Sequence, residues 1–439
     1  MVNRRRFCGT AAAAIATTQF PMFAHAQSSG DATSAIHPFK IHVPQTQLTD
    51  LRRRIKATRW PERETVADQS QGVQLAVIRE LAGYWATGYD WRRVEARLNS
   101  LPQFITQIDG LDVHFIHVRS KDPNALPIIV THGWPGSVIE QLKIIEPLAN
   151  PTAYGASASD AFHVVVPSVP GYGFSGKPAT AGWGPDHTAR AWTTLMKRLG
   201  YKQFVAQGGD IGALISTAMA IQAPPELLGM HTNFPGTIPA DIAKAIATGA
   251  APPTDLSADE KRAYLQIVDF RAKHFAYAAE MTLRPQTLYA LADSPVALAA
   301  WLFDHGDGWG QPAATIASAV AGHTIDGHSA GAVTRDDVLD NITLYWLTNT
   351  AVSAARFYWE NKGMSATNAV DISIPAAVSV FPGELYQAPR SWTERAYHKL
   401  IHYNALDKGG HFAAWEQPQL FSEELRASFR SVRKSVVKA

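Results

Sequence analysis

The chain has 439 residues, of which 46% are hydrophobic and 18% are charged, and its formal net charge is +2. A chain of this length can bury a large core and typically holds more than one structural unit. The nearly balanced charge gives no indication of a nucleic acid or other polyanionic partner. Outside the first residues, no apolar run is long enough to span a membrane.

The first 26 residues predict a cleavable export signal. The basic start Arg4-Arg5-Arg6 is followed by a weakly apolar run over residues 9–17 and by the A-x-A pattern Ala24-His25-Ala26. Paired arginines before an alanine-rich run are typical of a twin-arginine signal. We therefore expect cleavage near Ala26, a periplasmic protein and no membrane anchor on the mature chain. Cleavage would also remove Cys8, the single cysteine, so the mature chain would form no disulfide.

Residues 27–125 predict a meandering N-terminal region of helices followed by a hairpin. Helices are expected from Thr49, over about residues 73–86 and over residues 91–98, because apolar side chains recur there at helical spacing. Residues 104–108 and 113–118 then alternate as strands do, and Asp109-Gly110 between them is a typical hairpin turn.

Residues 126–235 alternate short apolar runs with helical patterns. Strands are expected at residues 127–131, 164–167, just before Gly208, and at residues 230–233. Strands that alternate with helices favour an α/β fold with a mostly parallel central sheet and helices on both faces. Such sheets place their chemistry at the carboxyl ends of the strands.

Residues 236–341 change to helices and loops and predict a helical lid. Ser257 with Glu260 forms a capping box, and Ser294-Pro295 is a typical helix start. Residues 306–332 are glycine-rich and predict an irregular segment, after which a capped helix begins near Thr334. Residues 342–439 predict a lid-end helix and then the second part of the core, with a strand over residues 377–381.

The stretch Gly208-Gly209-Asp210-Ile211-Gly212 lies between an apolar strand and a helix of small residues. This is the nucleophile-elbow pattern G-x-S-x-G with aspartate in the serine position. The glycines tolerate the tight turn, so the central side chain is held out at the end of the strand. A carboxylate there can attack carbon, which predicts Asp210 as a nucleophile.

Three groups follow one another in the chain order of the α/β-hydrolase triad: Asp210, Glu384 and His411. Each lies just beyond an expected strand, which is where a catalytic group of this fold belongs. Asp371 and Asp407 are alternatives to Glu384 as the acid. The backbone N–H groups of Trp134, in the turn after the first core strand, and of Ile211 are the expected oxyanion donors.

Four motifs give the chain a resemblance to the microsomal and juvenile-hormone-type epoxide hydrolases, and residues 38–61 resemble the N-terminal meander of that family. The motifs are His132 to Ser137, Gly208 to Gly212, Arg356 to Glu360 and Gly409 to Ala414. The resemblance implies Asp210 as nucleophile, His411 as base, Glu384 as its acid partner and two lid tyrosines that hold the epoxide oxygen. Tyr358 fits one of these tyrosine positions. Tyr277 fits the other by its place before Pro285, with Tyr289 as the alternative.

The resemblance implies that a small apolar epoxide and water are converted to a vicinal diol without a cofactor or a metal. Residues 171–176 match the dinucleotide fingerprint G-x-G-x-x-G, but no helix is expected directly after them. His398 and His402 have a metal-ligand spacing, but they lie in a segment that predicts a strand. A haloalkane-type dehalogenase with the same nucleophile and a non-catalytic binder of apolar molecules are the alternatives. The oligomeric state stays open.

Overall fold

The computed structural model describes residues 34–67, 70–236, 238–304, 312–325, 327, 329–361 and 371–436. The expected export signal over residues 1–26 lies outside the described residues.

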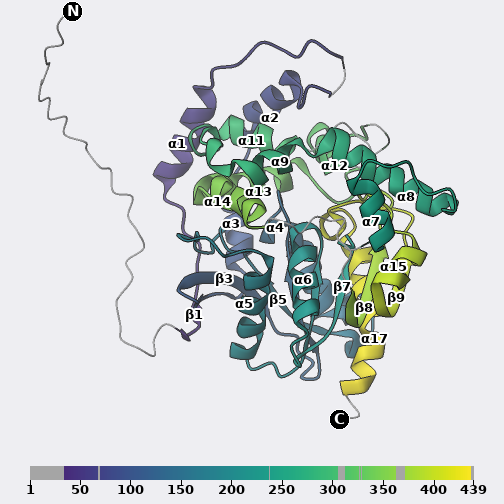
Figure 1. Cartoon of the computed structure of the whole chain (residues 1–439). Helices are drawn as coiled ribbons and strands as arrows, with labels where there is room; N and C mark the ends of the chain where they lie inside the picture. Colours follow the sequence, from purple (N-terminus) through teal and green to yellow (C-terminus); the bar gives the residue numbers. More distant parts are fainter. Residues whose placement is uncertain are drawn as a thin grey trace, which may run out of the picture.

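A single mixed sheet of nine strands forms the centre of the described chain (Figure 1). The strands follow the spatial order β1-β2-β3-β5-β4-β6-β7-β8-β9. Pairing is antiparallel from β1 to β5 and parallel across the remaining strands. The strands are β1 His37–Pro38, β2 Gln103–Ile108, β3 Leu111–Val118, β4 Leu126–Thr131, β5 Phe162–Pro167, β6 Phe204–Gly208, β7 Leu227–Thr232, β8 Ile372–Val380 and β9 Tyr397–Ala405.

The predicted hairpin is confirmed as β2 and β3, which pair antiparallel from end to end. Asp109 and Gly110 connect them with φ angles of +49° and +80°. Positive φ at both central residues is the requirement of a type I′ turn, which matches the twist of the two strands. The segment that holds His398 and His402 is also a strand, as predicted, and forms β9.

The predicted parallel sheet is confirmed, and helices cover both of its faces. Helices α5 and α6 pack together, as do α4 and α17, and each of these pairs contacts strands of the sheet. Strands such as β4 are apolar along most of their length because both faces are buried. The helices of this layer are α4 Val138–Ala149, α5 Pro185–Arg198, α6 Asp210–Gln222, α15 Arg390–Ala396, α16 Ala413–Glu416 and α17 Pro418–Val436, with 3₁₀ turns at Pro151–Tyr154 and Ala158–Asp160.

The N-terminal region packs its helices onto helices from much later in the chain. In Figure 1, α1 and α2 lie beside α11 at the end of the sheet where the lid helices gather, and these helices are in contact. Two buried hydrogen bonds join this region to α13: Tyr89 to Asp340 at 2.7 Å and Trp85 to Thr343 at 2.9 Å. The helices are α1 Gln45–Lys56, α2 Leu75–Thr87 and α3 Trp91–Asn99.

Between β7 and β8, the regular elements of the described residues are helices and helical turns. The capping boxes of Ser257 with Glu260 and of Thr334 with Asp337 are present, and Ser294 caps α11. The prediction that residues 306–332 are irregular is wrong for residues 312–321, which form α12. This segment lies between the glycines, is rich in alanine and begins with proline. The elements are α7 Ala240–Ala247, α8 Ala258–Asp269, a π turn at Phe270–His274, α9 Ala276–Leu283, a 3₁₀ turn at Pro285–Thr287, α10 Ala290–Asp293, α11 Pro295–Phe303, α12 Pro312–Ala321, α13 Arg335–Thr348 and α14 Ala351–Glu360. Among the described residues, no helix combines the length and the apolar character needed to cross a membrane.

Candidate active site

Asp210 lies in a sharp turn between β6 and α6, with a left-handed φ of +48°. A non-glycine residue adopts this conformation only where its surroundings enforce it. The glycines on either side make the turn possible: a Cβ on Gly208 would lie 2.0 Å from the carbonyl oxygen of Gly212, and one on Gly212 would lie 2.1 Å from that of Thr131. The predicted elbow is therefore present.

The two oxygens of the Asp210 carboxylate face different partners. Oδ1 accepts a hydrogen bond of 2.8 Å from the backbone N–H of Trp134, while Oδ2 lies 3.4 Å from Nε2 of His411. The N–H of Ile211 also donates to this carboxylate. Burial favours the neutral acid, but His411 and the two N–H donors outweigh burial and lower the pKa of Asp210. The carboxylate is thus held ionised and oriented, with both expected backbone donors directed at it.

His411 lies between Asp210 and Glu384. Its Nδ1 lies 2.5 Å from Oε1 of Glu384, and Glu384 is only 2% exposed. Burial disfavours the imidazolium, but the charge of Glu384 and the hydrogen bonds to both carboxylates raise the pKa of His411 well above its usual value. The two residues follow the neighbouring strands β8 and β9, whose connections meet at a bridge between Gly383 and Gly410.

The two alternative acids lie elsewhere. Asp371 has its Oδ1 3.6 Å from Nε2 of His398, and Asp407 is exposed. Of the three carboxylates that the sequence left open, only Glu384 contacts His411.

The turn after β4 approaches Asp210 closely. A Cβ on Gly133 would lie 2.5 Å from Cβ of Asp210, so only glycine allows this approach. The buried ring of His132 accepts a hydrogen bond of 3.1 Å from the backbone N–H of Val169, and burial lowers the pKa of His132 to about 4. His132 therefore holds the turn as a neutral ring.

Two lid tyrosines lie against Trp134. Tyr277 of α9 stacks on the Trp134 ring at a centroid distance of 4.9 Å, and Tyr358 of α14 meets that ring edge-on at 5.8 Å. Their phenols share a hydrogen bond. Burial, with the nearby charge of Asp210, raises the pKa of both phenols. Tyr289, the alternative to Tyr277, is 67% exposed, so it does not belong to this buried cluster.

Glu140 was not singled out from the sequence; it lies in the first turn of α4 and is 6% exposed. Its Oε1 accepts a hydrogen bond of 3.2 Å from the backbone N–H of Gly133, the residue before the donor Trp134. Burial raises the pKa of Glu140 to about 8. The signal in the sequence was its place three residues after Ser137, which caps the helix.

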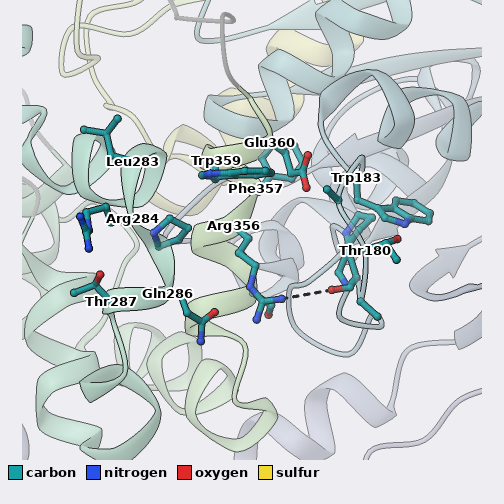
Figure 2. Close-up of a pocket in the computed structure, with 16 residues that line it drawn as sticks. Thr180, Trp183, Leu283, Arg284, Gln286, Thr287, Arg356, Phe357, Trp359 and Glu360 are labelled. Atoms are coloured by element: carbon teal, nitrogen blue, oxygen red, sulfur yellow. Dashed lines mark hydrogen bonds between the residues drawn. The ribbon is translucent and has the colours of Figure 1, made fainter.

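A groove of about 600 Å³ is lined by residues of α14 and of two other segments, and neither Asp210, Glu384, His411, Tyr277 nor Tyr358 lines it (Figure 2). Arg356 reaches from α14 across this groove to the carbonyl oxygen of Pro178, at 3.5 Å. Tyr358, two residues later on the same helix, instead belongs to the aromatic cluster at Trp134. Helix α14 thus contributes residues both to the groove and to the candidate site.

Comparison with known proteins agrees with this arrangement. The family model described as the epoxide hydrolase N terminus matches residues 36–141, and the model of the alpha/beta hydrolase fold matches residues 127–305. A protein of Stigmatella aurantiaca named as a candidate epoxide hydrolase is 52% identical over 399 residues, covering 91% of this chain and 86% of its own. Epoxide hydrolase 1 of Oryctolagus cuniculus is 33% identical, covering 89% of this chain and 88% of its own.

Among solved structures, this fold is similar to those of epoxide hydrolases. The juvenile hormone epoxide hydrolase of the silkworm Bombyx mori has a TM-score of 0.79 at 29% identity, with 92% of this chain and 96% of that chain covered. The epoxide hydrolase of Aspergillus niger has a TM-score of 0.74 at 30% identity, with 91% and 97% covered. The chain therefore belongs to the epoxide hydrolase family, hydrolases that are built on the α/β-hydrolase fold.

Proposed function

We propose that the protein opens a small apolar epoxide to a vicinal diol through a covalent ester on Asp210. The observation that supports this most directly is the division of the Asp210 carboxylate between two sets of partners. Oδ1 accepts a hydrogen bond from the backbone N–H of Trp134 and Oδ2 faces His411, while the N–H of Ile211 is a second backbone donor to the carboxylate. The pair of lid phenols at Trp134 adds an acid to this nucleophile.

In the first step, Oδ2 of Asp210 attacks a ring carbon of the epoxide and the strained carbon–oxygen bond breaks. Tyr277 and Tyr358 hydrogen-bond the ring oxygen, and one phenol gives it a proton as it leaves. A phenol suits this step because it supplies a proton without carrying a charge into an aromatic lid. The product is an alkyl ester of Asp210.

In the second step, water attacks Cγ of this ester. Esterification removes the negative charge of Asp210, so the pKa of His411 falls. The His411 imidazolium then gives its own proton to the phenolate, which restores the phenol and leaves His411 neutral and able to act as a base. It takes a proton from the attacking water, and the N–H groups of Trp134 and Ile211 stabilise the oxyanion. The bond to the diol oxygen then breaks, the diol oxygen takes the proton of the new carboxyl group, and Asp210 is regenerated.

Replacing His411 by alanine tests this sequence of steps. Ester formation should survive while hydrolysis fails, so His411→Ala mixed with an aryl epoxide should add one substrate mass to the peptide that carries Asp210. Turnover should fall by a factor of roughly 10²–10⁴ or more. An unmodified peptide together with unimpaired turnover would rule out the two-step mechanism.

We also propose that the chain is exported to the periplasm through a twin-arginine signal that is cleaved near Ala26. The proposal is supported by Arg4-Arg5-Arg6, the alanine-rich run and the A-x-A pattern. Replacing all three arginines by lysine should leave the full-length chain in the cytoplasm, as measured by fractionation and by the mass of the N-terminus. Normal export of this variant would show that the arginines are not read as such a signal.

A further inference from the structure

A second, much smaller cavity touches both Asp210 and His411. Its volume is about 20 Å³, which is enough for one water molecule. Phe412, Trp415 and Phe421 form its apolar wall. Ala413 and Ala414 complete this wall, and the polar side chains besides Asp210 and His411 are Glu140, Gln141, Gln207 and Asn233.

Three oxygens of these polar side chains are buried without a hydrogen-bond partner among the residues that the structure describes. They are Oε2 of Glu140, Oε1 of Gln141 and Oε1 of Gln207. The other polar atoms of the same side chains are engaged: Gln141 donates to Glu140 at 2.7 Å, and Gln207 donates to Asn233 at 3.2 Å. Since buried polar groups are nearly always hydrogen-bonded, three such oxygens around one cavity of this size indicate a shared small polar ligand.

The backbone is built to hold the Glu140 carboxyl in this place. A Cβ on Gly136 would lie 1.5 Å from Oε2, so a residue other than glycine would displace the carboxyl. Oε1 is fixed by the N–H of Gly133 and by Gln141, which leaves Oε2 as the free atom. Burial raises the pKa of this carboxyl to about 8, so it stays protonated at neutral pH and can donate a hydrogen bond.

We propose that this cavity binds the water that hydrolyses the Asp210 ester, and that Glu140 is the positioning residue that holds this water through Oε2. The inference rests on the proposed ester mechanism. The water donates one hydrogen bond to Nε2 of His411 and one to an amide oxygen of Gln141 or Gln207, and it accepts one from Glu140. One lone pair then stays free to attack Cγ of Asp210. The carbon–oxygen bond to water forms as His411 takes the proton, and the bond to the diol oxygen breaks.

The role predicts a defect in one step only. Glu140→Met has a similar volume but no polar atom at the cavity. Glu140→Gln keeps an acceptor for Gly133 and places an N–H donor where Oε2 lies. In rapid-quench single turnovers with an aryl epoxide, followed by mass spectrometry of the Asp210 peptide, Glu140→Met should form the ester within about threefold of the wild-type rate and hydrolyse it about 10–100-fold more slowly. The esterified enzyme should therefore accumulate. Glu140→Gln should restore hydrolysis to within about threefold of wild type.

Further variants keep the test decisive. Gln207→Met removes a second oxygen from the same cavity, so it should slow hydrolysis in the same way even if Glu140→Met does not fold. Asp340→Asn is the matched control: it changes another buried carboxyl with a raised pKa, outside this cavity, and should change neither step.

Two outcomes would overturn the inference. Equal losses in ester formation and hydrolysis in Glu140→Met and Gln207→Met would show that these side chains merely support the turn. Hydrolysis at the wild-type rate in both variants would show that the water is held elsewhere. Absence of any ester in His411→Ala, by contrast, would contradict the proposed mechanism itself.

Discussion

At the scale of single residues, the two lid phenols separate epoxide opening from dehalogenation. Their hydroxyls should matter only where an oxygen becomes the leaving group. Tyr277→Phe and Tyr358→Phe should each cost about 2–4 kcal/mol at the ring-opening transition state, comparable to the loss of an oxyanion donor. The double variant should be nearly inactive, because neither phenol can then compensate. The measurement is the single-turnover rate of ester formation on an epoxide and on a matched haloalkane.

The fold should not change in these variants, since each removes one hydroxyl and keeps the ring that packs on Trp134. A double variant that opens epoxides at the wild-type rate would contradict the role given to the phenols. If that variant instead lost activity on the haloalkane, dehalogenation would be the better description.

The residues of the site differ in how far the sequence predicted them. Asp210 was predicted from the glycine-rich elbow and His411 from the two glycines before it, and both predictions also relied on the order of the three groups along the chain and on the strand before each. The choice between Tyr277 and Tyr289 needed the structure, because the packing of Tyr277 on Trp134 joins segments far apart in the chain. Glu140 was missed, since an acidic residue in the first turn of a helix is usually an exposed, dipole-stabilised group. Its burial depends on the packing of α4 against α16 and α17, which lie far along the chain.

At the scale of elements, the contact between the N-terminal region and α13 holds part of the lid in place. Tyr89 donates to the buried Asp340, so Tyr89→Phe would leave that carboxyl without its donor. The free energy of unfolding should fall by about 1–3 kcal/mol. Tyr84→Phe is the matched control, because Tyr84 makes a similar bond of 2.8 Å to Asp336 near the surface and should lose less. Urea unfolding of the two variants measures the difference. Equal losses would contradict the importance of burial at this contact.

Helix starts and turns that depend on a short local sequence motif were predicted correctly. The caps at Ser257, Ser294 and Thr334 and the turn at Asp109-Gly110 act through neighbouring residues only, so the sequence was sufficient. Helix α12 was missed because the glycines on either side suggested an irregular segment. Its own residues favour a helix, and it packs against α11 and α13.

At the scale of the whole molecule, buried carboxyls make stability depend on pH. Burial raises the pKa of Glu140 to about 8 and those of Asp340 and Glu416 to about 7. The folded protein therefore keeps protons that the unfolded chain releases, so its stability falls as pH rises through these values. Buried histidines such as His114, with a pKa of about 3, act in the opposite direction, but only below about pH 6.5. We expect the urea midpoint to fall from pH 6.5 to 8.5.

Asp340→Asn should reduce this fall by at most about 1.4 kcal/mol per pH unit, since it removes one of the titrating groups. The comparison needs only urea midpoints of the two proteins at pH 6.5, 7.5 and 8.5. A wild-type midpoint that stays constant across this range would contradict the assignment of raised pKa values to these carboxyls.

The positions of the two tyrosines have a consequence for how such an enzyme can change over evolution. In the proposed mechanism the nucleophile, the base and the backbone donors all belong to the sheet and its connections, while Tyr277 and Tyr358 both belong to the helices inserted between β7 and β8. The half of the reaction that releases the product is thus encoded separately from the half that activates the leaving group. Substitutions within the insert can alter which ring is opened and at which carbon, while the machinery that regenerates Asp210 stays the same. The insert between β7 and β8 can therefore change the range of substrates, while the sheet and its connections keep the enzyme able to turn over.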